Sequence, residues 1–507
     1  MYETKYGYVT WKKNKLTFKE CKSSSQIPIS YGARATFRNE INSTGWAFLE
    51  VHTSKDVTDE QQAYAAGFIE GYLTRDLIWM HWQNMLKGNG IRDLTHSVPV
   101  TPGNIFIRKN CNKIECVSHP ITFLPSSVVW ATDRRPTQYI LQIKLYYIQL
   151  EGLAVGYNQA TSDPYQWLTA RDMVWINMLG DLDDLALSLA LPKDLPDGLL
   201  FGDHCTGLIK LLPDFKNLYT AHATWNSYQS MLRLQKMYVL HYKVSPLDKK
   251  RIPGYKMAFT SYPAFVQYMS ALRQSTDDFY IISSGLVAGE TTISNSNQTL
   301  FGLINPLCVM EYIRSMIANR LAVDGNQWTR IFRHHNSGTY NNQWIYVLRR
   351  TEQLVNTTYF PSYNIPYFPT IFNLSGGNVR VATFGDWFGY KTNPRANILK
   401  EKQAGITNLR DMFNTMRYND FKHDPLARCA CVPPYSACNA IAARNDLNPA
   451  NGTFPFRALG HRSHGGTDAK VTSWHLRKNY EFVAVSGPTF NISRGIPPFV
   501  FVHFKYF

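Results

Sequence analysis

The sequence predicts an α+β protein built from packed layers of helices and sheets. Strand-like alternation fills residues 1–55, helical periodicity dominates from about residue 58 to 190, and strands return after residue 205. The elements therefore occur in blocks, without the regular strand–helix alternation of a doubly wound sheet. With 507 residues, of which 44% are hydrophobic and 14% aromatic, the chain has ample material for a large packed interior.

The first long helix is predicted to begin after Thr58. Strand-like segments precede it at 6–11, 15–18 and 45–53. The Thr58 side chain can cap the helix while Gln61 reaches back to it. Apolar residues then recur on one helical face at Ala65, Phe68, Ile69, Tyr72 and Leu73. Gly88 and Gly90 are expected to end the helix.

Two further helices are predicted, near 137–153 and over 165–190. The second becomes acidic at Asp181, Asp183 and Asp184. Three carboxylates are candidate calcium ligands, but the regular ligand and glycine spacing of a calcium loop is missing. We therefore expect a solvated helix end.

Pro192, Pro196 and Gly198 then break the helical pattern and mark an internal boundary. Beyond it we expect strands at 207–212, 218–225, 255–262 and 279–288, a helix at about 307–322, and a strand at 343–348. The first two of these strands form a predicted hairpin.

Cys205 stands where the loop gives way to this hairpin. A lone cysteine entering a strand is usually a small core residue. His222 and Trp225, on the second strand of the predicted hairpin, favour another interpretation. If the chain were cut before Cys205, one residue would carry both a thiol nucleophile and an α-amine that serves as its base.

The other cysteines indicate an oxidising compartment. Cys111 lies close to Cys116, and Cys429, Cys431 and Cys438 form a cluster. Both groups are typical of local disulfide loops. The cluster and His423 are an alternative zinc site, but the paired Cys-x-x-Cys spacing is missing. We expect disulfides, and neither a metal nor another cofactor.

Six glycosylation sequons point to the secretory route. They are Asn42, Asn297, Asn356, Asn373, Asn451 and Asn491. The N-terminus lacks the apolar core of a signal peptide, so we expect that peptide to be missing from this sequence. The sequence contains no apolar run of 18 residues, so no transmembrane helix is predicted. The expected location is the lysosome or the extracellular space.

The charge balance is basic. Lys and Arg outnumber Asp and Glu by 53 to 37, which gives a formal charge of +16. Such an excess suits acidic partners, including phospholipid headgroups and a membrane surface. The basic residues are spread along the chain without a block, which argues against a nucleic-acid-binding arm. The oligomeric state stays open, a homodimer included.

Several blocks, in order along most of the chain, resemble the phospholipase B-like family, the lamina-ancestor group of N-terminal nucleophile hydrolases. Among them are Gln-Ala-Tyr-Ala-Ala-Gly-Phe-Ile-Glu-Gly-Tyr-Leu-Thr and Arg-Ser-His-Gly-Gly-Thr-Asp-Ala-Lys-Val-Thr-Ser. The full set is 62–74, 283–293, 336–344, 363–366, 385–388, 416–425, 446–452 and 462–473.

The resemblance implies a four-layer αββα sandwich and self-cleavage between His204 and Cys205. Fragments 1–204 and 205–507 would stay associated as one compact domain. Cys205 would be the nucleophile and its liberated α-amine the general base.

The resemblance also implies roles for five further residues. His222 and Trp225 match pocket positions, and Thr292 matches a pocket hydroxyl that binds the amine or the substrate. Asn364 matches an oxyanion donor. Arg395 would lie beside Cys205, favouring its thiolate and orienting the amine.

The implied activity is removal of fatty acyl chains from glycerophospholipids and lysophospholipids through a Cys205 thioester. The same groups would also hydrolyse an amide, so an amidase acting on N-acyl lipids or small peptide-like substrates is an alternative. A non-catalytic lysosomal or secreted binding protein is a third interpretation. The residues alone do not separate ester from amide hydrolysis.

Overall fold

A computed structural model describes residues 4–13, 15–85, 138–188, 205–266, 279–304, 308–346 and 352–499. Within these residues helices and strands occur together in separate sheets and helical layers, which confirms the α+β prediction. No helix among them is both long and apolar enough to cross a membrane.

The largest described sheet contains β1 (Thr4–Lys12), β2 (Lys15–Cys21), β3 (Ala33–Glu40), β4 (Trp46–Thr53), β8 (Arg233–Val239), β9 (Lys256–Ser261), β10 (Phe279–Ile282), β11 (Val287–Thr292) and β12 (Asn342–Tyr346). Their spatial order is β12-β11-β10-β9-β8-β4-β3-β1-β2. The pairs are antiparallel except β4 and β8, which run parallel with Trp46 opposite Arg233. Strands from before and after Cys205 therefore share one sheet.

A second sheet contains β5 (Thr206–Leu211), β6 (Leu218–Ala223), β13 (Tyr359–Ser362), β15 (Asp468–Ser473) and β16 (Val483–Ser486), in the order β13-β5-β6-β15-β16. All its pairs are antiparallel. Strands β5 and β6 form the predicted hairpin, with Gly207 opposite His222.

Trp225 does not belong to that hairpin, so this part of the prediction is wrong. It begins β7 (Trp225–Ser227), which pairs with β14 (His464–Gly466) in a separate two-stranded sheet. The chain leaves the second sheet at Thr224, where the backbone N–H donates to the Asp468 carboxylate at 3.4 Å. The Thr224 carbonyl accepts from the backbone N–H of Thr467 at 2.8 Å, just after β6 ends at Ala223.

The helices are α1 (Ile41–Thr44), α2 (Asp59–Leu73), α3 (Arg75–Met85), α7 (Gln138–Ala160), α8 (Ala170–Asn177), α9 (Leu179–Ser188), α10 (Glu311–Leu321), α11 (Gly325–Phe332), α12 (Glu352–Thr357), α13 (Pro369–Leu374), α14 (Gly377–Phe384), α15 (Pro394–Lys402) and α16 (Leu409–Met416). The predicted capping box of Thr58 and Gln61 opens α2. The single helix predicted to begin after Thr58 is divided at Thr74 into α2 and α3. The helix predicted over 165–190 is divided into α8 and α9. Gly88 and Gly90 lie outside the described residues.

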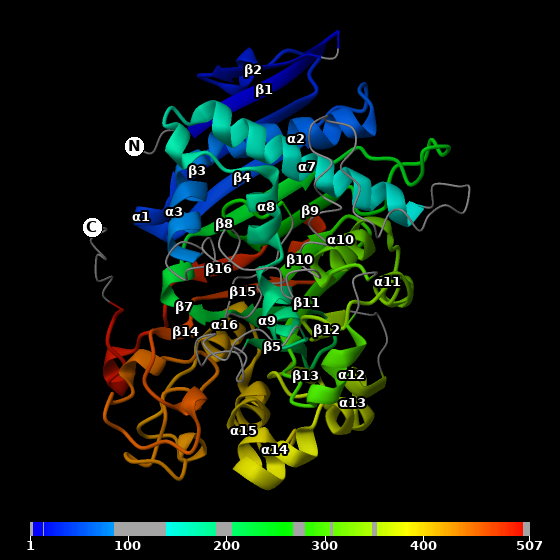
Figure 1. The fold of residues 1–507 in the computed structure, drawn as a ribbon. Coiled ribbons are helices and arrows are strands. Elements are labelled where there is room, and N and C mark those ends of the chain that lie inside the picture. Colours follow the sequence, from blue (N-terminus) through cyan, green and yellow to red (C-terminus); the bar gives the residue numbers. More distant parts are fainter. Residues whose placement is uncertain are drawn as a thin grey trace.

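Helices α2 and α7 lie unusually close together. A Cβ atom on Gly67 would lie 1.8 Å from the carbonyl oxygen of Gln149, and one on Gly152 would lie 2.1 Å from that of Tyr64. Only glycine allows this approach of two backbones. The 62–74 block therefore encodes a helix contact, and the paired helices cross the strands at the top of the molecule (Figure 1).

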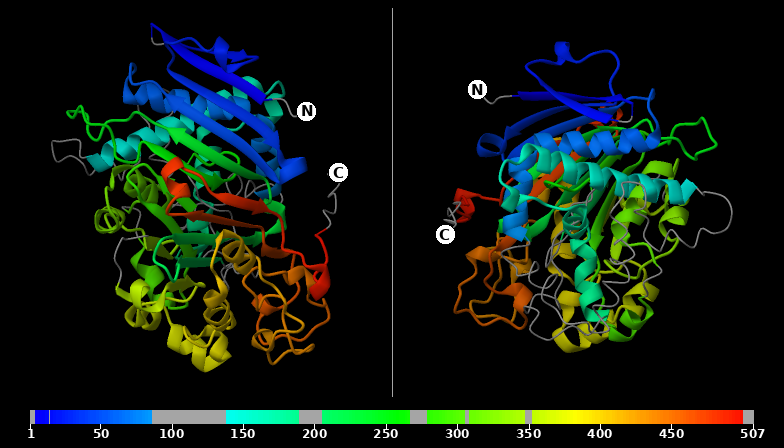
Figure 2. Two further views of the ribbon diagram at one scale, coloured as in Figure 1. Left: turned by 180° about the vertical axis from the view of Figure 1, so that it is seen from behind. Right: turned by 45° about the horizontal axis from the view of Figure 1, so that its top comes forward.

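The layers stack through three apolar contacts. Helices α2 and α7 cover one face of the nine-stranded sheet, where Phe68 and Phe259 share a core. On the opposite face, Ile345 of β12 packs with Ile209 of β5 in the second sheet. Helices α15 and α16 cover the other side of the second sheet, with Met412 in that core. Figure 2 shows the strands between these helical groups.

The acidic end of α9 is not solvated as expected. Asp181 is fully buried, and its Oδ1 accepts the Glu311 N–H at 3.2 Å and the Thr339 hydroxyl. The Oδ2 of Asp184 accepts the Tyr340 N–H at 2.7 Å. The expectation fails because α9 docks against residues 310–341, whose backbone donors these carboxylates satisfy.

Candidate functional site

The site lies at Cys205, where the chain enters β5. Cys205 is fully buried. Its backbone N–H donates to Asn364 Oδ1 at 3.0 Å, and its carbonyl accepts from Arg395 Nη1 at 2.7 Å. His204, and with it the predicted cleavage site, lies outside the described residues. The two hydrogen bonds fix the backbone on which the predicted nucleophile stands.

Arg395 is the second residue of α15, and its N–H donates to the capping side chain of Asn393 at 2.9 Å. Its buried guanidinium donates to oxygens on every side: Cys205 O at 2.7 Å, Asn364 Oδ1 at 2.9 Å, Tyr363 O at 2.6 Å and Thr206 Oγ1 at 3.3 Å. Burial lowers the pKa of Arg395 to about 10, so it remains a cation at neutral pH. The structure therefore holds a fixed positive charge beside Cys205.

Asn364 connects Cys205 with β11. Its side-chain oxygen accepts from both Cys205 and Arg395, and its Nδ2 donates to the Thr292 carbonyl at 2.8 Å. Its backbone φ of 68° is left-handed, a conformation that asparagine tolerates better than most residues. The amide oxygen thus faces the group that would become the α-amine. One N–H of the amide nitrogen is used by Thr292, and the second is the one that could donate to an oxyanion. The role of Asn364 as an oxyanion donor stays a prediction.

Thr292 ends β11 and contributes its backbone to this chain of hydrogen bonds. Its hydroxyl lies 2.8 Å from the hydroxyl of Tyr340. Contact of that hydroxyl with the amine or the substrate stays a prediction. Tyr340 was not singled out from the sequence, although it lies in the 336–344 block. It links Asp184 of α9, through its backbone N–H, to Thr292 and so to Asn364.

His222 and Trp225 flank the entry of β5. His222 is buried, with Nδ1 3.4 Å from the Thr224 hydroxyl. Burial lowers its pKa to about 3, so the imidazole is neutral near physiological pH. The Trp225 indole donates to the Ile441 carbonyl at 3.0 Å, and its ring centre lies 4.6 Å from the Arg395 guanidinium. The structure brings Trp225 against Arg395 and seats His222 on the strand that pairs with β5.

A buried charge network that the sequence did not indicate joins the two large sheets. Arg233 of β8 donates to Asp468 of β15 at 2.6 Å, and Lys470 donates to Asp468 at 2.9 Å and to the Thr224 hydroxyl at 2.5 Å. All three charged side chains are fully buried. Asp468 and Lys470 lie in the 462–473 block. Their spacing suits a strand, and only the three-dimensional pairing shows that they meet Arg233.

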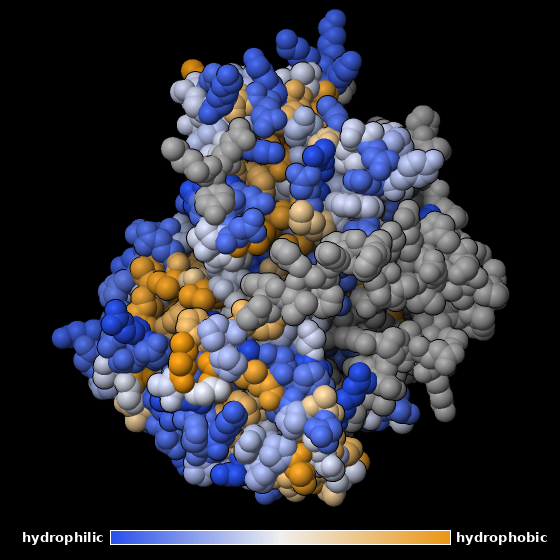
Figure 3. Space-filling view, turned by 90° about the vertical axis from the view of Figure 1, so that its left-hand side faces the viewer, coloured by the Kyte–Doolittle hydropathy of each residue, from blue (hydrophilic) through white to orange (hydrophobic). Residues whose placement is uncertain are grey.

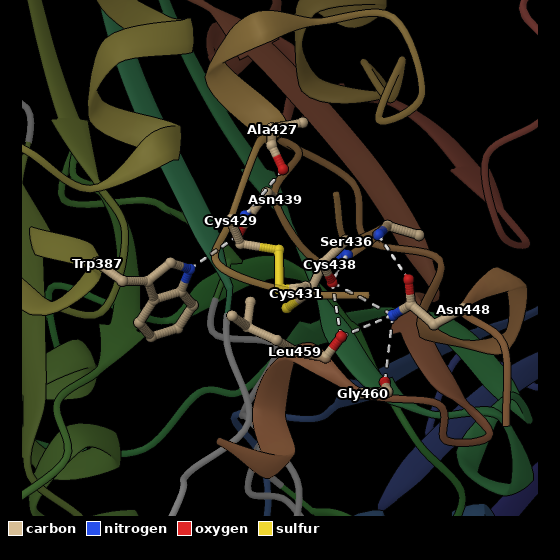
Figure 4. Close-up of a disulfide and its surroundings, with 11 residues drawn as sticks. Trp387, Ala427, Cys429, Cys431, Ser436, Cys438, Asn439, Asn448, Leu459 and Gly460 are labelled. Atoms are coloured by element: carbon tan, nitrogen blue, oxygen red, sulfur yellow. Dashed lines mark hydrogen bonds between the residues drawn. A yellow bond between two sulfur atoms is a disulfide. The ribbon is translucent and has the colours of Figure 1, made fainter. Parts of the chain in front are cut away.

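A pocket has Asn364 and Arg395 in its wall, the two residues that hold the Cys205 backbone, while Cys205 itself is not among its lining residues. Segments around α13 and α14, at the lower end of the molecule in Figure 1, supply the apolar side chains Phe372 and Phe388. Trp387 completes this wall, and its indole donates to Asn439 at 2.7 Å (Figure 4). The pocket is thus apolar for much of its lining and polar where it meets the Cys205 site.

The cysteine cluster contains one local disulfide, between Cys429 and Cys431 (Figure 4). Cys438 is buried and lies outside this disulfide. His423 contacts Asp420 at 2.8 Å instead of the cluster. Cys111 and Cys116 lie outside the described residues. In the parts of the chain that the structure describes, no three His, Cys, Asp or Glu side chains gather as metal ligands.

The sequons differ in exposure. Five asparagines are exposed, namely Asn42, Asn356, Asn373, Asn451 and Asn491. Asn297 is half-buried, and its Nδ2 donates to the Leu374 carbonyl at 3.0 Å. Glycosylation at all six positions stays a prediction.

Comparison with known proteins agrees with the sequence blocks. A family model described as Phospholipase B matches residues 33–350 and 348–507. The chain is 40% identical over 505 residues to human phospholipase B-like 2, covering 92% of this chain and 81% of that protein. It is 37% identical over 503 residues to phospholipase B-like 1 of Caenorhabditis elegans, covering 92% and 82%. It is 35% identical over 503 residues to phospholipase B-like protein B of Dictyostelium discoideum, covering 92% and 80%.

Proposed function

The chain belongs to the phospholipase B family, and on that premise we propose that it is an acyl hydrolase with Cys205 as its nucleophile. The observation that carries the proposal is the clamp on Cys205. Asn364 accepts its N–H and Arg395 donates to its carbonyl, and the same two side chains form part of a pocket wall. A nucleophile held beside a cation, by two residues that also face a pocket, suits acyl transfer.

Maturation is the first step of the proposed mechanism. The Cys205 thiol attacks the carbonyl carbon of His204, and the peptide C–N bond breaks as the nitrogen takes a proton. Water then hydrolyses the resulting thioester, which leaves a carboxylate at residue 204 and a free amine and thiol on Cys205. Arg395, bonded to the Cys205 carbonyl, holds the residue in place during this exchange.

Turnover would use the new amine as the general base. An α-amine ordinarily has a pKa of about 7.7–8.0, so its neutral form is available near neutral pH. It takes the thiol proton while the thiolate attacks the acyl carbonyl. An N–H of Asn364 stabilises the developing oxyanion. The leaving alkoxide takes the proton from the amine, and water, deprotonated by the same amine, hydrolyses the acyl thioester.

The αββα sandwich of N-terminal nucleophile hydrolases is part of this proposal. The contacts of α2 and α7 with the first sheet, of that sheet with the second, and of α15 and α16 with the second support it. Fragments 1–204 and 205–507 would stay together because β4 and β8 pair across the cut.

The proposed substrates are glycerophospholipids and lysophospholipids. The apolar pocket wall suits an acyl lipid, and the formal charge of +16 suits an anionic lipid surface. One face of the molecule also carries apolar patches among hydrophilic groups (Figure 3). A lysosomal or secreted location accords with the Cys429–Cys431 disulfide.

The test compares an ester with an amide. The purified protein is incubated at acidic and neutral pH with a lysophospholipid and with an N-acyl ethanolamine of equal chain length, and the released fatty acid is measured. We expect release from the ester by the wild type and none by the Cys205→Ala variant. Release from the amide alone would favour the amidase, and equal release by both proteins would refute the nucleophile.

A further inference from the structure

We propose that Arg380 forms an anion-binding subsite in the pocket lined by Asn364 and Arg395, which takes the phosphate of a phosphate-bearing acyl lipid. This subsite rests on the proposed function, because it specifies the substrate of that same site. Arg380 lies on α14 and lines the pocket together with Asn364 and Arg395. One pocket therefore joins the Cys205 clamp to a second guanidinium.

The two arginines of this pocket differ in their partners. Arg395 donates through Nη1 and Nη2 to four protein oxygens. The Arg380 side chain, in contrast, has no carboxylate or hydrogen-bond acceptor among the described residues. Its only described side-chain contact is with the ring of Phe388, whose centre lies 5.5 Å away.

Arg380 is half-buried, and its guanidinium donors have no acceptor among the described residues, so they are available to a ligand that enters the pocket. Burial lowers the pKa of Arg380 to about 10, so the guanidinium remains charged at neutral and acidic pH. A pair of phosphate oxygens matches the planar fork of an arginine and accepts two of its N–H groups at once. The unmet donors thus favour an anionic ligand over a neutral one.

The rest of the pocket wall fits the remainder of such a molecule. The pocket that Arg380 and Arg395 line also has apolar side chains in its wall, those of Ile365, Phe372 and Phe388. Trp387 is fixed by its hydrogen bond to Asn439, so this wall is preformed. An amphiphile with a phosphate at Arg380 would place its glycerol and ester in the same pocket as Asn364. A neutral acylglycerol would leave Arg380 unpaired.

Binding is tested with lipids that cannot be cleaved, so that the result does not depend on hydrolysis. The probes are an ether analogue of lysophosphatidylcholine and the ether analogue of monoacylglycerol with the same short chain, titrated calorimetrically below their micelle concentrations. The proteins are the cleaved wild type and the Arg380→Gln, Arg380→Lys and Arg330→Gln variants. Arg330 is an exposed arginine with no described side-chain partner, so it controls for loss of one charge.

We expect the wild type to prefer the phosphate-bearing probe, and Arg380→Gln to weaken binding of that probe about 10- to 100-fold without affecting the neutral one. Arg380→Lys should restore part of the preference, and Arg330→Gln should bind like the wild type. Inorganic phosphate as competitor separates two sources of the anion. If inorganic phosphate displaces the lipid probe only at a much higher concentration than that of the probe, the subsite's ligand is the phosphate of a lipid. If inorganic phosphate displaces the probe at an equal concentration, the ligand is free phosphate.

Two outcomes would overturn the subsite. One is a wild type that binds both probes equally, and the other is an Arg380→Gln variant that weakens both to the same extent. Neither depends on acyl hydrolysis. If the ester of the previous experiment is not cleaved while the phosphate preference is present, the proposed function fails and the subsite stands.

Discussion

At the scale of single residues, Arg395 and Asn364 act as one unit around Cys205. Arg395 donates to the Cys205 carbonyl and to Asn364, and Asn364 accepts from the Cys205 N–H. Moving either side chain would therefore move the other and the nucleophile together. Effects of substitutions at these positions should be strongly non-additive.

Arg395→Lys is expected to lower turnover about 10- to 100-fold. Lysine keeps the positive charge but lacks the planar fork that bonds Cys205, Asn364 and Tyr363 at once, so one or two charged hydrogen bonds are lost. Steady-state kcat and the rate of self-cleavage measure the effect.

Arg417→Lys is the matched control. Arg417 is a half-buried arginine that also donates to backbone carbonyls, those of Gly487 and Pro488, but it lies outside the pocket wall. An equal loss in both variants would assign the Arg395 effect to stability rather than to the site.

Residue types and their order singled out Cys205 with His222 and Trp225, but not the side chains that hold Cys205 in place. The resemblance marked Asn364 and Arg395, and the structure brings both to Cys205. Tyr340 and Asp468 could not be found in this way, because their contacts join residues far apart in sequence. Local spacing carries no signal for such a contact.

At the scale of elements, α9 is the last described helix before Cys205. Two of its carboxylates accept hydrogen bonds from the backbone of residues 311 and 340. Asp181 accepts the Glu311 N–H, and Asp184 accepts the Tyr340 N–H. Burial raises the pKa of Asp181 to about 6 and that of Asp184 to about 7. Since a carboxyl raised above its ordinary value binds its proton more tightly in the folded state, its contribution to stability is full below pH 3.8 and is lost as the pH rises through about 7.

Asp184→Asn is therefore expected to raise the melting temperature relative to the wild type more at pH 8 than at pH 5. Asparagine keeps an oxygen that accepts from Tyr340 but never carries the buried charge. Melting curves of the two proteins at both pH values give the difference, in which shared contributions from other groups cancel.

Asp214→Asn serves as the control for this prediction. Asp214 is an exposed turn residue whose Oδ1 accepts the Lys216 N–H at 3.0 Å. Its variant should show the same small difference at both pH values. A pH-independent difference for Asp184→Asn would show that its carboxyl is not the titrating group.

Elements with local signals were predicted well, and their ends were not. The capping box of Thr58 and Gln61 fixes the start of α2 within a few residues of sequence. At the end of β6 the Thr224 N–H contacts Asp468, which is 244 residues away in sequence, so no local pattern marks this end. Strand β3 was missed between the N-terminal strands that were predicted.

At the scale of the whole molecule, the nine-stranded sheet contains strands from both sides of the predicted cleavage point. Strand β4 comes before Cys205 and β8 after it, and they pair in parallel from Trp46 opposite Arg233 to His52 opposite Val239. A buried ion pair between Glu70 of α2 and Lys236 of β8, at 2.7 Å, adds to the connection. The order of strands in this sheet was not predictable, because it depends on pairings between distant segments.

Cleavage should therefore not release the N-terminal fragment. We expect the two fragments to co-elute in size-exclusion chromatography under native conditions and to separate only in denaturant. Separation of the fragments in native buffer would contradict the shared sheet as the connection between them.

The most direct test of the account is the N-terminal sequence and intact mass of the protein after incubation at acidic pH, beside the Cys205→Ala variant. The account predicts a fragment that begins Cys-Thr-Gly-Leu-Ile-Lys in the wild type and an uncut chain in the variant. A wild type that hydrolyses acyl lipids while remaining uncut, or a variant that is cut at the same bond, would contradict it.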